Sequence, residues 1–89
     1  MIAPRWRSVD PSLRWYERPG EAEVIAFSPL SGSVHLVTPS VRPLLEALSA
    51  APRSLDEIVV LLAAFNLNAA DAQATVESLE LADLIEPVP

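Results

Sequence analysis

The sequence has 89 residues, 51% of them hydrophobic, which suits one compact domain that needs neither disulfides nor metals to fold. It contains no cysteine, which excludes disulfides and cysteine-based zinc sites and fits a reducing compartment. The longest apolar run, Ile58 to Phe65, is far shorter than the ~20 residues of a membrane-spanning helix. No signal-peptide pattern begins the chain. We therefore expect one cytoplasmic domain over residues 1–89.

The net charge of −6 is spread unevenly. Residues 1–20 carry four arginines and two acidic residues, whereas residues 21–89 carry two arginines and ten acidic residues. Nucleic acids attract proteins through clustered lysines and arginines. Because the sequence has no lysine and its second part is strongly negative, these charges disfavour a nucleic-acid partner.

Three short strands are predicted in the first half of the sequence. In residues 13–18 successive side chains point to opposite faces of a predicted strand. Pro19-Gly20 then supplies the backbone angles of a type II turn. Residues 22–28 are rich in β-branched and aromatic side chains, and a turn over residues 29–33 leads to a third strand, Val34–Val37. Successive strands with tight turns predict an antiparallel meander with the third strand at an edge.

The next segment predicts a helix. Apolar residues recur there at helical spacing: Val41, Leu44, Leu45 and Leu48. Pro43 is tolerated only in a first helical turn, which favours Ser40 as the N-cap.

Two further helices have clear N-terminal signals. Ser54 and Glu57 form a capping box for one helix, and Asn68 caps the next, with Asp71 in its first turn. The expected core positions of both helices, with a final extended tail, are Leu55, Ile58, Val59, Leu62, Phe65, Ala72, Val76, Leu79 and Leu84-Ile85.

No catalytic constellation is visible, so we expect a protein that is not an enzyme and binds no cofactor or metal. The single histidine, His35, has no cysteine to join it in a metal site, and Gly20 and Gly32 lie in separate turns rather than in a phosphate loop. Both tryptophans, Trp6 and Trp15, are expected to pack against the fold, although Trp6 is also a candidate exposed anchor for a partner.

The last two helices resemble a helix-turn-helix and, with the strands, indicate a winged-helix scaffold. Such scaffolds often place the second helix of the pair in the major groove of DNA. Here that helix carries four acidic residues and no basic one (Asp71, Glu77, Glu80 and Asp83). A winged-helix DNA-binding regulator therefore stands only as an alternative function.

The predicted edge strand offers a different function. Val34–Val37 has neither a charge nor a proline to prevent pairing, so a peptide could add to it as another strand. A second copy of the protein could pair in the same way, which leaves a plain dimerisation module, and hence a possible homodimer, as a further alternative.

The sequence resembles the PqqD family of peptide chaperones, also called RiPP recognition elements, from Trp6 to Glu86. Trp6 and the Ser-Gly-x-x-His-Leu pattern look closest to the branch found with an HPr-kinase-related gene system. The segments that carry the resemblance are Arg14-Trp15, Val24–Phe27, Ser31–Leu36, the Leu44, Leu45 and Leu48 helix, and the closing Leu79–Glu86.

The resemblance implies an α+β, winged-helix-like fold: a three-stranded antiparallel sheet followed by a three-helix bundle. It also implies a non-catalytic chaperone that binds a precursor's leader peptide by strand addition and presents it to a modifying enzyme, with no nucleic acid or membrane as partner. Carried over by position, the peptide-binding residues are Val34, His35, Leu36, Val37, Gln73, Val76, Glu77 and Glu80. The sequence departs from the family pattern at Ser49–Arg53, where an Asp-Gly is common, and after Leu36, where an Asn is usual.

Overall fold

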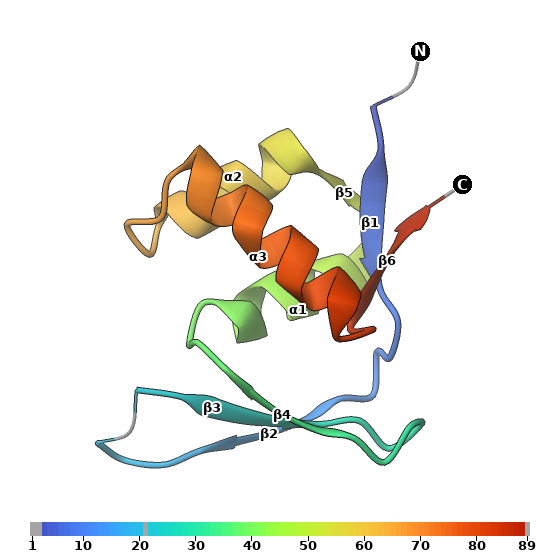
Figure 1. Ribbon diagram of the computed structural model, residues 1–89, viewed down its shortest axis with the longest axis vertical. Coiled ribbons are helices and arrows are strands. Elements are labelled where there is room, and N and C mark those ends of the chain that lie inside the picture. Colours follow the sequence, from blue (N-terminus) through green and yellow to red (C-terminus); the bar gives the residue numbers. More distant parts are fainter. Residues whose placement is uncertain (1–2, 21, 89) are drawn as a thin grey trace.

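The computed structural model describes residues 3–20 and 22–88, and in this part of the chain six strands form two three-stranded antiparallel sheets beside three helices (Figure 1). The elements are β1 (Arg5–Ser8), β2 (Arg14–Glu17), β3 (Val24–Phe27), β4 (Val34–Val37), α1 (Val41–Ala50), β5 (Arg53–Ser54), α2 (Leu55–Ala63), α3 (Ala69–Leu81) and β6 (Ile85–Val88). One sheet has the order β2-β3-β4 and the other the order β5-β1-β6.

The β2-β3-β4 sheet is the meander that the sequence predicts. Its pairs include Trp15 with Ala26 and Ala26 with His35. Gly20 has φ +80° in the turn after β2, a left-handed backbone conformation that residues other than glycine rarely adopt. One face of this sheet packs toward the helices, which buries Val24 and Ala26.

The β5-β1-β6 sheet joins segments that are distant in the sequence. β1 lies in its centre, with Trp6 opposite both Arg53 of β5 and Pro87 of β6. The Trp6 ring packs against the core, and its Nε1–H donates to Glu80 Oε1 of α3 at 2.8 Å. The expectation that Trp6 packs against the fold is confirmed.

The helices supply most of the core. As expected, Ser54 and Glu57 form a capping box and Asn68 caps α3. The structure adds a second capping box, which was not predicted from the sequence, because the Asp71 side chain also accepts from the Asn68 amide. Ser40 precedes α1, but its hydroxyl contacts Thr38 Oγ1 at 3.2 Å rather than a helical amide. The buried core residues from α1 to β6 are Val41, Leu44, Leu45, Leu48, Ile58, Leu62, Ala72, Val76, Leu79, Leu84 and Ile85.

A buried carboxylate connects the two sheets. Asp10 follows β1, and its Oδ1 accepts from the Ser12 hydroxyl at 2.6 Å and the Ser12 amide at 2.8 Å. Its Oδ2 accepts from the Ser28 hydroxyl at 2.8 Å, just after β3. These bonds, led by the one from the Ser12 hydroxyl, outweigh the opposing effect of desolvation and lower the pKa of Asp10 from 3.8 to about 2. Asp10 therefore fixes the β1–β2 connection to the start of the β3–β4 turn.

The predicted fold class was wrong in its arrangement. A three-stranded sheet followed by a three-helix bundle omits the whole β5-β1-β6 sheet, whose strands lie before, between and after the other elements. β5 has two residues and β6 contains Pro87, so neither resembles a strand locally. Both depend on pairing with β1, about 45 to 80 residues away in sequence, which no local pattern reveals.

One predicted core position was also wrong. Phe65 is 42% exposed, because α2 ends at Ala63 and the chain turns away before the helical stripe reaches residue 65. Among the described residues, no helix is both long enough and apolar enough to cross a membrane.

Candidate functional site

The helix-turn-helix is formed by α2, a short connection and α3. The amides of Phe65 and Leu67 donate to the Leu62 carbonyl at 2.9 and 3.3 Å, which closes the end of α2. Asn66 has φ +61°, a left-handed conformation that asparagine tolerates better than most residues. Asn68 then caps α3: its Oδ1 accepts from the Asp71 amide at 2.8 Å.

The surface of α3 is acidic. Asp71 and Glu77 are exposed, Glu80 is half-buried and accepts from Trp6 Nε1–H, and α3 contains no lysine or arginine. Carboxylates at contact distance repel phosphate groups. A duplex would therefore meet repulsion if this helix entered its major groove.

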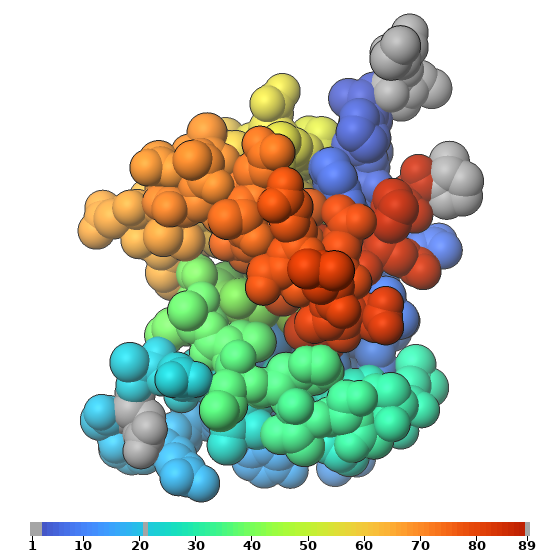
Figure 2. All heavy atoms as spheres, in the orientation of Figure 1, coloured from blue at the N-terminus to red at the C-terminus, as the bar shows by residue number. Residues whose placement is uncertain are grey.

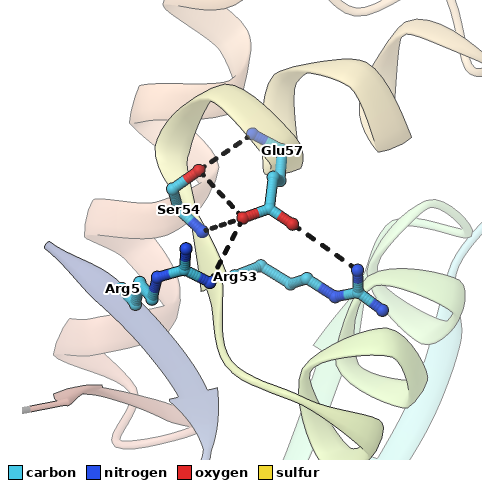
Figure 3. A network of polar contacts seen from close by, with 4 residues as sticks. All are labelled: Arg5, Arg53, Ser54 and Glu57. Carbon is cyan, nitrogen blue, oxygen red and sulfur yellow. Dashed lines mark hydrogen bonds and ion pairs between the residues drawn. The ribbon is translucent and has the colours of Figure 1, made fainter. Parts of the chain in front are cut away.

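A polar network fixes the start of α2 to the β5-β1-β6 sheet (Figure 3). The Ser54 hydroxyl accepts from the Glu57 amide at 3.3 Å, and Glu57 Oε1 accepts from the Ser54 amide at 3.3 Å. Arg5 of β1 and Arg53 of β5 each approach the Glu57 carboxylate at 3.5 Å. The hydrogen bond from the Ser54 amide contributes most to lowering the pKa of Glu57. The Ser54 hydroxyl and the two arginines contribute less, and partial desolvation opposes the shift.

Two more arginines form ion pairs elsewhere on the surface. Arg7 Nε lies 2.7 Å from Glu86 across the β1–β6 ladder. Arg42 pairs with Glu17 at 3.2 Å and Glu46 at 2.9 Å, and its guanidinium lies 5.9 Å from the centre of the Trp15 ring.

Arg14 and Arg18 differ from the other four arginines. Neither forms an ion pair with a carboxylate of residues 3–20 or 22–88. Arg14 is an exposed residue of β2, and Arg18 is an exposed residue just after that strand.

The predicted site residues fall into three environments. Val34 and Leu36 are exposed on β4, whereas His35 and Val37 are half-buried on the face toward the helices. On α3, Gln73 and Glu77 are exposed and Glu80 is half-buried. Val76 is 3% exposed and forms part of the core.

A groove of about 410 Å³ lies between the end of β4 and α3. It includes Leu36 and Val37 of the predicted set, but its α3 wall does not contain Gln73, Glu77 or Glu80. The residues of that wall are Asp71, Ala74, Thr75, Ser78 and Leu79. Sequence reasoning missed this wall, although the buried Ala72, Val76 and Leu79 set the phase of α3 and could have located it.

No metal centre is apparent in the described ranges: no three His, Cys, Asp or Glu side chains lie close enough together there to hold an ion.

The comparison with known families decides what kind of domain this is. The family model for the DprA winged helix domain matches residues 36–89, more than half of the chain. The chain belongs to the DprA winged helix domain family. The match begins in the second half of β4 and spans α1, β5, α2, α3 and β6. No curated protein and no solved structure matches the chain.

The DprA match corrects the predicted family. The resemblance to the PqqD family, and with it the peptide-chaperone description, was wrong, because the matching model is that of a different family. A precursor peptide and a modifying enzyme are accordingly not supported as partners. The winged-helix alternative that the sequence left open is the better supported reading of the function.

Proposed function

We propose that this protein is a non-catalytic winged-helix domain that binds DNA as part of DNA processing. The observation that carries the proposal is the DprA winged helix match, which coincides with the α1-β5-α2-α3-β6 segment. Winged-helix domains of the DprA type are associated with DNA processing, and a place in the cytoplasm is part of the proposal.

The charges favour one way of contacting DNA over another. The acidic side chains of α3 oppose insertion of this helix into a groove. Arg14 lies in β2 of the β2-β3-β4 sheet, and Arg18 follows that strand. Neither forms an ion pair with a carboxylate of the described residues. We propose that these two arginines contact phosphates while α3 faces away from the duplex.

The proposal is tested by fluorescence anisotropy with labelled duplex and single-stranded DNA over a series of salt concentrations. We expect weak binding that falls as salt rises, because phosphate contacts release counterions. Replacing Arg14 and Arg18 together by Gln should weaken binding and reduce the salt slope by about one for each lost phosphate contact.

Two controls identify the contacting face. Arg7→Gln removes the same charge from an arginine that is already paired with Glu86, and it should change binding less. Glu77→Gln on α3 should leave the affinity unchanged; tighter binding by this variant would place α3 at the DNA. Absence of binding to both forms of DNA at low salt would refute the proposed function.

A further inference from the structure

The free edge of β4 differs from the other exposed strand edges. Strand edges are usually protected from pairing by charge, proline or short length. β2 carries Arg14 and Glu17, β5 has two residues, and β6 contains Glu86 and Pro87. β4, Val34–Val37, pairs with β3 on one side, has no such protection on the other, and lies at the surface in the green-to-turquoise part of Figure 2.

The ladder shows which backbone groups face the free edge. The Ser28 amide donates to the Ser33 carbonyl, so residues 28 and 33 form a hydrogen-bonded pair. Hydrogen-bonded and non-hydrogen-bonded pairs alternate along an antiparallel ladder. In the register of β3 and β4, Val34 and Leu36 therefore fall at non-hydrogen-bonded positions. Their N–H and C=O groups point away from β3, toward the free edge.

The side chains of the same two residues are also exposed. Val34 is 64% and Leu36 is 68% exposed, on the sheet face opposite the buried Val24 and Ala26, and Leu36 also borders the groove between β4 and α3. An apolar side chain and an unpaired set of backbone groups therefore occur together at each position.

We propose that this edge binds a second copy of the chain, β4 against β4, as a two-fold antiparallel pair centred on His35. In this register Val34 lies opposite Leu36 of the second copy, and Leu36 lies opposite Val34 of the second copy. Both pairs join the edge-facing backbone groups, so the ladder closes with hydrogen bonds from each chain. Both pairs also place apolar side chains next to each other on the same face.

The edge is complementary to itself, because its two edge-facing residues, Val34 and Leu36, meet their counterparts in the second copy as apolar pairs. Each copy carries a net charge of −6, yet β4 contains no charged side chain, so the pairing places no like charges directly opposite. The contact is small compared with the ~800 Å² per partner of a stable interface. We therefore infer a weak dimer that grows with protein concentration and also with salt, because salt screens the repulsion between the two negative molecules. The inference does not depend on the proposed function. The two can also be distinguished by experiment, because rising salt should strengthen the dimer but weaken DNA binding.

Sedimentation velocity over a concentration series tests the dimer. The mass of the natural protein should rise from 9.6 kDa toward twice that value as concentration and salt increase. Leu36→Lys should shift the midpoint of association at least tenfold upward, because it puts a charge at the pairing edge. The matched control is Leu81→Lys on α3: Leu81 is 88% exposed, and this change should leave the association unaltered.

A second variant tests the backbone directly. Leu36→Pro removes an N–H that faces the free edge and is not used by β3, so it should abolish association while the circular dichroism spectrum is retained. If Leu36→Pro fails to fold, Leu36→Lys and amide exchange at Val34 and Leu36 still decide, because these amides should become protected as concentration rises. A protein that stays monomeric throughout, or a dimer that Leu36→Lys leaves intact, would overturn the inference.

Discussion

Asp10 holds the two sheets together through its carboxylate oxygens, whose partners come from the Ser12 turn and from Ser28 and Leu30 near the β3–β4 turn. A buried carboxylate is stable only when such partners replace water. Nothing in the sequence around Asp10 shows that it connects the two sheets, because Ser28, its hydrogen-bond partner on the other sheet, lies 18 residues away.

The lowered pKa of Asp10 predicts a specific pH dependence. Because the folded pKa, about 2, is below the ordinary value of 3.8, the carboxylate's contribution to stability is complete above pH 3.8 and is lost as the pH falls toward 2. Asp10→Asn should lower the urea midpoint at neutral pH, and the gap to the natural protein should narrow across this window. Glu23→Gln exchanges an exposed carboxyl in the same way, and this variant should have the same urea midpoint as the natural protein throughout. A gap for Asp10→Asn that does not depend on pH would contradict the role of the charge.

At the scale of elements, local signals predict most of the helices and the β2-β3-β4 meander. The apolar spacing of α1 and the capping residues Ser54 and Asn68 are read directly from the sequence. Val34–Val37 is found with its exact bounds because turn residues border it on both sides.

Elements that depend on distant partners were not predictable in the same way. β1 reads as Arg-Trp-Arg-Ser, and only its place between β5 and β6 makes it the central strand of a sheet. The groove beside β4 was missed in part for a different reason: the buried stripe of α3 gives the phase of this helix, but its exposed residues were assigned by resemblance to a family rather than from that phase.

The capping of α3 gives a prediction at this scale. Asn68→Ala should reduce the free energy of unfolding by about 1 kcal/mol, because the Asp71 amide loses its acceptor at the helix N-terminus. Asn68→Ser, which keeps a capping oxygen, should retain most of the stability. Urea unfolding of the two variants measures this difference, and equal losses would show that the Asn68 side chain is not what stabilises the start of α3.

For the molecule as a whole, the family match and the folding unit do not coincide. The DprA winged helix match begins at Leu36, yet β1 lies in the middle of the β5-β1-β6 sheet and Trp6 packs on the core. The matched segment alone would leave β5 and β6 without a strand between them.

A fragment of residues 36–89 should therefore lack a cooperative unfolding transition, because it loses the central strand and the Trp6 contacts. Circular dichroism during heating is the measurement, with the full 89-residue chain as the reference. A sharp transition in the fragment would show that β1 is an addition to an independent winged helix rather than a part of it.

The central place of β1 also has a topological consequence. Arg5 and Val88 face each other across the β1–β6 ladder, and the two ends of the described chain leave the molecule side by side (Figure 1). A short flexible bridge between them would close the backbone into a ring without crossing any element, and a cut in the β2–β3 loop would then give a permuted chain with every ladder intact. Ring closure restricts the unfolded chain far more than the folded one, so the cyclic form should be the harder one to denature.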